Sequence, residues 1–227
     1  MRAYLFDIDG TIISTGGAGM RSMDRAFEGL LGFFGAQGSR DYSGRIDHDI
    51  FCDVIHQHRG ENPSKDELQF VKEKYIEFLK EELKKTDAFK IMPGIPEWLA
   101  LLKEDTDAVV GLATGNLELA AKIKMDHAVL AEYFDFGGFG DSARDRVVVI
   151  KDAMEKARQT APEPIKMFYV IGDSKNDIVS GRRAGAITVA VATGRASVDE
   201  LVKHQPDYIF ENLSQYEDVH KILINHT

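Results

Sequence analysis

Asp7 and Asp9 are the residues of this sequence whose types and spacing point most directly to chemistry. They follow a short apolar run, residues 3–6, that is typical of a buried strand, and a Gly-Thr pair then breaks the strand into a turn. Two carboxylates held together repel each other unless a cation lies between them or one takes a proton. A hard divalent ion with oxygen ligands, above all Mg²⁺, suits such a pair. One carboxylate can then attack phosphorus while the other passes a proton.

An Asx turn that closes a hairpin would also contain Asp-Gly, so this motif alone leaves both interpretations open. A second apolar run, residues 108–113, leads into Thr114, Gly115 and Asn116 at the start of a helical pattern. The hydroxyl and the backbone N–H groups of such a turn can bind phosphate oxygens. Thr114 or Asn116 would serve equally well as a helix N-cap, so this turn does not decide the question by itself.

A third apolar run, residues 167–171, is followed by Asp173, and Asp177 comes one helical turn later on the same side. These acids can complete an oxygen shell for Mg²⁺, although aspartate is also favoured at helix starts. In open parallel sheets, ligands gather beyond the carboxyl ends of the strands. We therefore expect Asp7, Thr114 and Asp173 to meet at one edge of a sheet, since three such strand ends are improbable as a coincidence.

The rest of the chain predicts the elements that must position these residues. From residue 89 on, apolar strands alternate with helical patterns, which indicates a parallel sheet covered by helices on both faces. The first strand must pair into this sheet, because one strand is not stable alone. Residues 16–88 show helical periodicity, a capping box at residues 64–67 and no convincing strand. We predict an α/β fold with a three-layer Rossmann-like core domain, residues 1–15 and 89–227, and an inserted all-helical domain, residues 16–88.

Composition restricts the class of partner. The chain has 227 residues, of which 44% are hydrophobic and 29% charged, as in globular proteins. The net charge of -9 disfavours nucleic acid and anionic membranes as partners, and an anionic substrate would need a local positive source. No apolar stretch is long enough to span a bilayer, and the N-terminus does not read as a signal peptide. The single cysteine, Cys52, fits a reducing compartment, so we expect a cytoplasmic protein.

Together these motifs resemble those of the haloacid dehalogenase-like superfamily. Asp7-x-Asp9-Gly10-Thr11, then Thr114-Gly115-Asn116, then Gly172-Asp173-x-x-x-Asp177 are similar to its first, second and fourth motifs. The most similar branch is the phosphoglycolate phosphatase-like group, in which a helical cap domain is inserted after the first strand. The resemblance covers nearly the whole chain, because the insertion and the order of elements also agree.

The resemblance implies a Mg²⁺-dependent phosphatase, a phosphoric monoester hydrolase, that acts on a small phosphorylated metabolite such as phosphoglycolate or a sugar phosphate. Asp7 would be the nucleophile that forms an aspartyl-phosphate, and Asp9 would protonate the leaving alcohol and later activate water. Thr114 would hydrogen-bond the transferring phosphoryl group. Asp7, the main-chain carbonyl of Asp9 and Asp173 would bind Mg²⁺, with Asp177 supporting that shell.

The third motif of the superfamily is a lysine, often followed by proline, and this chain has no Lys-Pro pair. Arg146 and Lys151 are the candidates for this cation, and we favour Arg146 because of its spacing before Asp173. An arginine can hold both a phosphoryl oxygen and the nucleophile's carboxylate. An exposed arginine within the charged run of residues 144–146 is the alternative.

Substrate binding is expected at Gly115, Asn116 and Arg45. Arg45 lies in a loop before a helix of the inserted domain, where related caps contact substrate, and could bind a second anionic group. An exposed turn residue paired with an acid is an equally good interpretation of Arg45.

Three other functions remain open at this point. A haloacid dehalogenase would need no Mg²⁺, but the dehalogenases of the family lack an acid at the position of Asp9. A phosphomutase of the β-phosphoglucomutase type keeps all these carboxylates, but its cap places a histidine and a lysine soon after the first motif, and residues 16–19 offer neither. A non-catalytic binding module is the third alternative. We expect a monomer or a homodimer.

Overall fold

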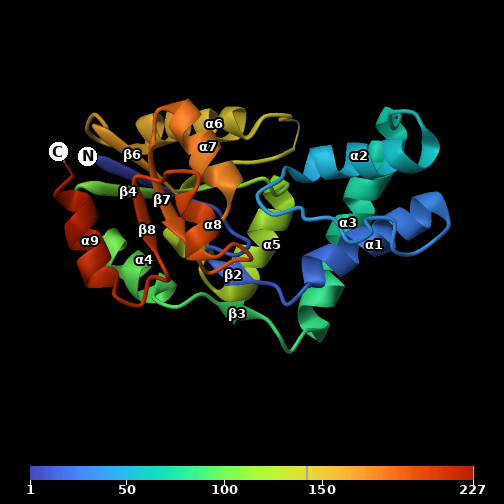
Figure 1. Cartoon of the computed structure of the whole chain (residues 1–227), viewed down its shortest axis with the longest axis horizontal. Helices are drawn as coiled ribbons and strands as arrows, with labels where there is room; N and C mark the ends of the chain where they lie inside the picture. The colour runs from blue at the N-terminus through green and yellow to red at the C-terminus, as the bar shows by residue number, and fades with distance from the viewer. Residues whose placement is uncertain (142, 227) are drawn as a thin grey trace.

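A six-stranded sheet forms the centre of the protein in this computed structural model, which describes residues 1–141 and 143–226 (Figure 1). Its strands are β1 (Arg2–Phe6), β4 (Ala108–Ala113), β5 (Phe136–Gly138), β6 (Met167–Gly172), β7 (Ile187–Val191) and β8 (Tyr208–Phe210). They lie in the order β5-β4-β1-β6-β7-β8, and every neighbouring pair is parallel. Because β1 lies between β4 and β6, its almost wholly apolar sequence is buried on both faces.

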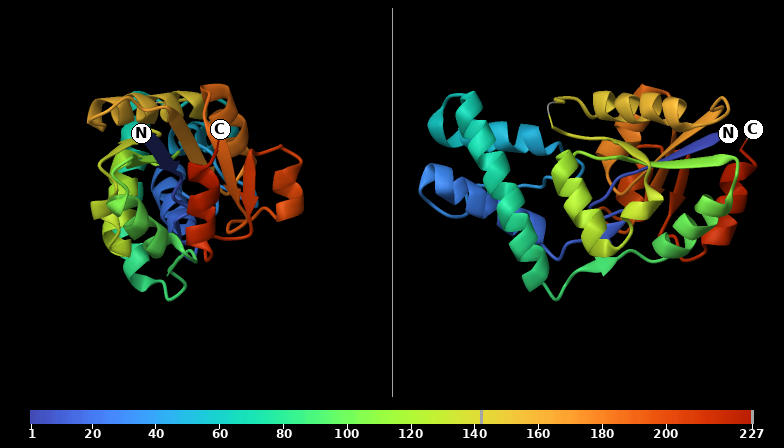
Figure 2. Two further views of the ribbon diagram at one scale, coloured as in Figure 1. Left: turned by 90° about the vertical axis from the view of Figure 1, so that its left-hand side faces the viewer. Right: turned by 180° about the vertical axis from the view of Figure 1, so that it is seen from behind.

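Helices cover both faces of this sheet, as the side views in Figure 2 show. One face carries α6 (Arg146–Thr160) and α7 (Lys175–Ala184), and the other carries α4 (Ile95–Glu104), α5 (Glu118–Ala128) and α9 (Tyr216–Ile224). On the α4 face, the Trp98 ring packs edge-on against Tyr4 and Phe6 of β1. A short helix, α8 (Val198–Val202), packs near β8. The predicted three-layer α/β fold is confirmed.

Three helices between the first and second strands of this sheet pack on one another, away from the sheet (Figure 1). They are α1 (Ala18–Leu31), α2 (Asp47–Arg59) and α3 (Lys65–Lys85), and we call them the helical lobe. Phe27, Phe51 and Tyr75 stack edge to face at its centre. The predicted capping box is present at the start of α3, where Ser64 and Glu67 each bond the other's backbone N–H. The division into domains at residues 15/16 and 88/89 stays a prediction.

Two short strands join the helical lobe to the sheet, and the sequence patterns did not predict them. β2 (Ile13–Ser14) and β3 (Lys90–Ile91) pair antiparallel, with Ile13 opposite Ile91 and Ser14 opposite Lys90. The segments that enter and leave the lobe therefore lie side by side. Two-residue strands are too short to show a hydrophobic period, which explains why the patterns missed them.

One strand lies later in the chain than expected. The aromatic run over residues 133–136 predicts a short strand there, but β5 begins only at Phe136, after a 3₁₀ turn over Ala131–Tyr133. Tyr133 and Phe134 pack against the main apolar core from outside the sheet, so their apolar character does not indicate a strand. Among the described residues, no helix is long and apolar enough to cross a membrane.

Candidate active site

Asp7 lies at the centre of the sheet edge, where β1 ends between the ends of β4 and β6. Its backbone N–H donates to the carbonyl of Ile171 at 2.9 Å, which holds the start of the motif against β6. Thr114 follows β4 on one side and Asp173 follows β6 on the other. The three polar strand ends that the sequence placed at one edge are therefore neighbours in space.

Arg146 is the cation that contacts the expected nucleophile. It is the first residue of α6, with only 5% of its side chain exposed, and its Nη2 lies 2.8 Å from Asp7 Oδ1 and 2.5 Å from Asp177 Oδ1. Burial alone would lower the pKa of this guanidinium, but Asp177 and Asp7 more than offset that effect and raise it. Lys151, the alternative cation, lies exposed on the same helix. Of the two candidates, the structure brings Arg146 to Asp7.

Three buried carboxylates surround this arginine. Asp7, Asp173 and Asp177 each place an oxygen within 4.8 Å of the others. Burial, Asp177 and Asp7 raise the pKa of Asp173 to about 8, because the guanidinium of Arg146 compensates only part of the negative charge. Burial and Asp7 likewise raise the pKa of Asp177. The single positive charge of Arg146 therefore does not balance the three carboxylates.

A Mg²⁺ ion fits this cluster. Its donors are all carboxylate oxygens, the ligand type that Mg²⁺ prefers. Oδ1 of Asp7 and Oδ1 of Asp177 are buried without an aligned hydrogen-bond donor among the described residues, although both form ion pairs with Arg146. A Cβ added at Gly194 would lie 1.6 Å from Asp173 Oδ2, so only glycine allows the loop after β7 to approach this carboxylate.

Asp177 also has a local structural role. Its Oδ2 accepts hydrogen bonds from the backbone N–H of Ser174 at 3.1 Å and from the Ser174 hydroxyl at 2.6 Å, which forms a capping box at the start of α7. The helix-capping interpretation of this aspartate is therefore correct for one oxygen. The other oxygen faces Arg146, so both interpretations describe parts of the same side chain.

A hydrogen bond joins the side chains of Asp9 and Asn116. Asn116 Nδ2 donates to Asp9 Oδ2 at 2.8 Å and to the hydroxyl oxygen of Thr114 at 2.8 Å. The Thr114 oxygen also accepts from the backbone N–H of Asn116 at 3.3 Å, so its own proton remains available to donate. Thr114 is fully buried beneath this pair. The turn after β4 thus holds Asp9 through a side-chain network.

A segment of the helical lobe, residues 42–47, contacts the same edge of the sheet, and we call it the contact segment. The Arg146 Nη1 donates to the carbonyl of Gly44 at 3.0 Å, and Asn176 Nδ2 donates to the carbonyl of Ser43 at 3.0 Å. The backbone N–H of Asp47 donates to the carbonyl oxygen of Gly115 at 2.8 Å. Residues that follow β4 and β6, together with the first residue of α6, therefore hold the contact segment.

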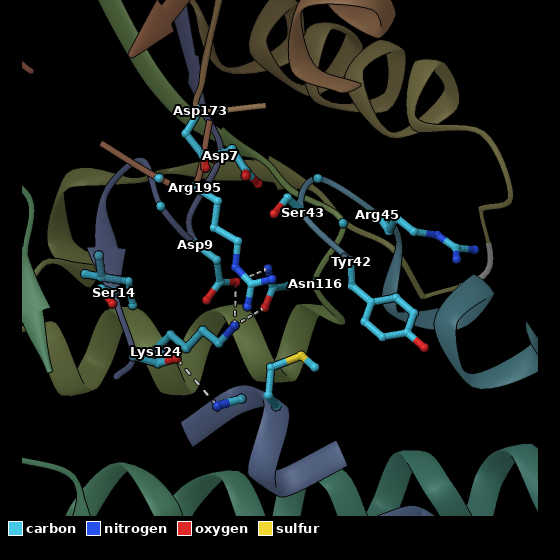
Figure 3. Close-up of a pocket in the computed structure, with 18 of the residues that line it drawn as sticks. Asp7, Asp9, Ser14, Tyr42, Ser43, Arg45, Asn116, Lys124, Asp173 and Arg195 are labelled. Carbon is cyan, nitrogen blue, oxygen red and sulfur yellow. Dashed lines mark hydrogen bonds and ion pairs between the residues drawn. The ribbon is translucent and has the colours of Figure 1, made fainter. Parts of the chain in front are cut away.

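The Arg45 side chain points away from the carboxylates, as Figure 3 shows. Its Nη2 forms an ion pair with Asp53 Oδ2 at 2.5 Å on the outer side of α2. This is the paired surface arginine that we considered as the alternative. Its backbone carbonyl still lines the cavity beside Gly115. A role in substrate binding stays a prediction that would require the Asp53 pair to open.

A cavity of about 380 Å³ lies between the sheet edge and the helical lobe. Three cations that the sequence patterns did not single out line it: Lys90 from β3, and Lys124 from α5 and Arg195 from the loop after β7, which are labelled in Figure 3. Arg195 is 67% exposed and lies 3.6 Å from Asp41 of the helical lobe. In the same loop, the Thr193 hydroxyl donates to the carbonyl of Gly10 at 2.6 Å. The rule that ligands gather at strand ends also applies to β7 and would have found this loop.

The arrangement of a central aspartate, a second acid two residues later and a third acid after a neighbouring strand agrees with a known family. The sequence matches the family model described as haloacid dehalogenase-like hydrolase over residues 4–191. The chain belongs to the haloacid dehalogenase-like hydrolase family. The recognition made from the three motifs is therefore confirmed, as is the prediction that the protein is an enzyme.

Several known proteins are similar to this hydrolase over nearly its full length. A protein of Caldanaerobacter subterraneus subsp. tengcongensis with the name "Putative pyrophosphatase PpaX" is 30% identical over 217 residues, which cover 94% of this chain and 91% of that protein. A phosphoglycolate phosphatase of Aquifex aeolicus is 27% identical over 235 residues, covering 100% and 98%. The crystal structure of a hydrolase from Pseudomonas syringae has a TM-score of 0.74 at 18% identity, covers 98% and 99%, and supports the fold alone.

Proposed function

We propose that this hydrolase is a Mg²⁺-dependent phosphatase that hydrolyses a small phosphorylated metabolite through an aspartyl-phosphate on Asp7. One observation carries the proposal: the Asp7 carboxylate lies 2.8 Å from the buried guanidinium of Arg146, and Asp9, two residues later, lines the same cavity. An anionic nucleophile needs such a cation to approach an anionic phosphoryl group.

The reaction would proceed in two displacements. An Asp7 oxygen attacks phosphorus and the bond from phosphorus to the leaving oxygen breaks, while Asp9 gives that oxygen its proton. Asp9 then takes a proton from the water that attacks the aspartyl-phosphate, which releases phosphate and restores Asp7. Arg146, the Thr114 hydroxyl and the N–H groups of Gly115 and Asn116 would hold the phosphoryl oxygens.

Asp7, the main-chain carbonyl of Asp9 and Asp173 would hold Mg²⁺, with Asp177 supporting Arg146 and the shell. The ion would offset the negative charge on the phosphoryl oxygens. The raised pKa of Asp173 supports this assignment, because a bound cation would offset the burial and the repulsion from Asp177 and Asp7 that raise it.

The substrate would be small and anionic. A volume of about 380 Å³ is at the lower end of ligand pockets. Among the described residues that line the cavity, four cations balance four acids although the chain has a net charge of -9: Lys90, Lys124, Arg146 and Arg195 against Asp7, Asp9, Asp47 and Asp173, with the Arg45 side chain paired to Asp53 instead. The cavity lining is therefore less negative than the chain as a whole, which favours an anion. Phosphoglycolate and sugar phosphates are therefore the first compounds to assay. The name of one relative supports phosphoglycolate, and the name of another adds pyrophosphate.

In this proposal residues 16–88 are the cap domain, which closes on the core and keeps bulk water from the aspartyl-phosphate. The contact segment supports that assignment, because it carries backbone groups of the helical lobe onto Arg146 and Gly115. We further propose that the enzyme acts in the cytoplasm, as a monomer or homodimer, on a small metabolite and not on nucleic acid or a membrane.

The test is phosphate release from a panel of phosphoglycolate, sugar phosphates and pyrophosphate, in Mg²⁺ and in EDTA. We expect turnover that requires the metal and that Asp7→Asn abolishes. Asp152→Asn, which removes an exposed carboxylate on α6, is the matched control and should retain full activity. If no compound of the panel released phosphate, the proposed phosphatase activity would be contradicted. Transfer of labelled phosphoryl from Asp7 back to a sugar phosphate, without release, would instead indicate a phosphomutase.

A further inference from the structure

Lys124 occupies a position where lysine is rarely found. The buried side of α5 consists of Ala120, Ala121, Lys124, Met125 and Ala128, so this lysine is the only charged member of an otherwise apolar stripe. Only 3% of its side chain is exposed. A buried ammonium is costly unless it is paired and hydrogen-bonded, so its partners must explain why it is there.

Both partners of Lys124 belong to the proposed active site. Its Nζ donates to Asp9 Oδ2 at 2.6 Å and to Asn116 Oδ1 at 2.5 Å (Figure 3). An ammonium only donates, and Asp9 Oδ2 accepts whether or not Oδ1 carries the acid proton, so the Asn116 amide between them has one possible orientation. Its Oδ1 faces Lys124 and its Nδ2 faces Asp9, so the three side chains form a closed ring of hydrogen bonds.

This ring leaves the two oxygens of Asp9 in different situations. Oδ2 accepts from both Lys124 and Asn116, whereas Oδ1 has no hydrogen-bond donor among the described residues. The Asp9 side chain is 43% exposed and lines the cavity, so Oδ1 is the oxygen that can face a substrate. Without the ring, the carboxylate could rotate about its Cβ–Cγ bond and turn either oxygen toward the cavity.

We propose that Lys124 is a positioning residue that fixes the Asp9 carboxylate so that Oδ1 exchanges the proton with the leaving oxygen. The inference rests on the proposed function, because it assigns Lys124 to the acid of that reaction. Lys124 fixes Oδ2, and the proton passes from Oδ1 to the leaving oxygen as the phosphorus–oxygen bond breaks. The structural alternative is an ion pair that only joins α5 to the turn after β1.

The two interpretations differ in how the loss of Lys124 depends on the leaving group. An alkyl alkoxide needs a well-placed proton donor, whereas the 4-nitrophenolate leaving group of 4-nitrophenyl phosphate needs little protonation. If Lys124 positions the acid, Lys124→Met should lower kcat for an alkyl phosphate by roughly a hundredfold, the scale of general acid catalysis. The same variant should lower kcat for 4-nitrophenyl phosphate only a few-fold.

Lys122→Met is the matched control, since Lys122 lies on the same helix, is 67% exposed and pairs only with Asp126 among the described residues. It should leave both rates unchanged. In an Asp9→Asn background, Lys124→Met should not lower kcat for the alkyl phosphate more than kcat for 4-nitrophenyl phosphate, because there is no acid left to position. Methionine has a similar length and suits an apolar stripe. If that variant does not fold, Lys124→Gln, which keeps a donor, serves instead.

The outcomes separate this inference from the proposed function. If the wild type hydrolyses both esters and Lys124→Met slows them equally, Lys124 is structural and only the inference fails. An additive loss in the Asp9→Asn background would overturn it in the same way. If the wild type releases phosphate neither from 4-nitrophenyl phosphate nor from any compound of the panel, the phosphatase itself is contradicted and the inference falls with it.

Discussion

Arg146 donates a hydrogen bond of 3.0 Å to the backbone carbonyl of Gly44, so a core side chain that contacts the nucleophile also contacts the helical lobe. Its Nη2 faces Asp7 and its Nη1 faces Gly44. The planar guanidinium can serve both because its donors point in different directions, whereas a lysine offers one nitrogen. The position of the lobe and the charge beside Asp7 are therefore coupled through one group.

Arg146→Lys tests this coupling. The substitution keeps the positive charge but removes one of the two contacts, so we expect kcat to fall by about tenfold to a hundredfold, on the scale of one lost transition-state donor. Hydrogen exchange of the contact segment should become faster at the same time. Arg158→Lys, at an exposed position of the same helix, is the control. Unchanged exchange in residues 42–47 would show that Arg146 acts on Asp7 alone.

Gly44→Ala tests whether close approach of the contact segment is required. Gly44 has φ of +64°, and a Cβ there would lie 2.1 Å from Ser174 Oγ. Gly38 has the same φ but open space around the added Cβ, so Gly38→Ala isolates the backbone cost, about 1–2 kcal/mol. We expect unfolding experiments to find that cost in both variants. Only Gly44→Ala should also lower kcat, by about a hundredfold if the segment shifts by an ångström.

Equal kinetic effects of the two alanine variants would contradict the requirement for close approach. The comparison is informative because the two glycines have the same φ but differ in what surrounds them. Circular dichroism and the urea midpoint of each variant would exclude global unfolding as the cause of any lost activity.

The strand ends could be predicted from the sequence, because strand limits are local and parallel strands direct their carboxyl ends to one edge. Asp7, Thr114 and Asp173 meet for this reason. The contacts of Arg45 could not be predicted, since they depend on how α2 orients a long side chain toward Asp53. The contact segment was equally inaccessible, because it depends on how the lobe lies on the core.

The burial of Lys124 could have been predicted from the sequence, although our sequence analysis did not predict it. The helical phase of residues 118–128 places position 124 on the apolar side and position 122 on the exposed side. A lysine on the apolar side of a helix requires an acidic partner. The helical pattern alone therefore places Lys124 inward, and Asp9 is the acid that pairs with it in the structure.

Asp173→Asn tests the metal site by its effect on stability. In the wild type, Mg²⁺ should raise the free energy of unfolding by about 2.7 kcal/mol at a concentration of about 100 times its dissociation constant. The variant should lose that increase and metal-dependent turnover together. Without metal at neutral pH it should be at least as stable as the wild type, because an amide avoids the cost of burying an ionisable carboxyl beside Asp177 and Asp7, which raises the pKa of Asp173 in the folded protein. Urea titrations with Mg²⁺ and with EDTA measure both effects.

Asp177→Asn is a useful comparison for that experiment. Its amide can still accept from Ser174, but it loses the ion pair with Arg146. We therefore expect it to be less stable than the wild type even without metal, in contrast to Asp173→Asn. A stability gain in both variants would show that simple charge repulsion dominates the cluster.

Asp47→Asn tests a pH dependence that arises in the helical lobe. The Asp47 carboxylate is buried and its Oδ2 accepts from the backbone N–H of Leu117 at 3.0 Å, at the start of α5. Burial raises its pKa from 3.8 to about 7, although the charge of Lys124 and the Leu117 N–H partly offset that increase. The folded protein thus binds a proton here more tightly than the unfolded chain does.

The sign of the effect follows from proton linkage. The stability contributed by this group is complete below about pH 4 and is lost as pH rises through about 7. In Asp47→Asn the amide oxygen still accepts from Leu117 but cannot ionise, so the variant should gain stability relative to the wild type between pH 5 and pH 8. Urea titrations at both pH values measure the difference. Asp53→Asn, at an exposed position of the same helix, should keep the pH dependence of the wild type, and persistence of that dependence in Asp47→Asn would assign it to another group.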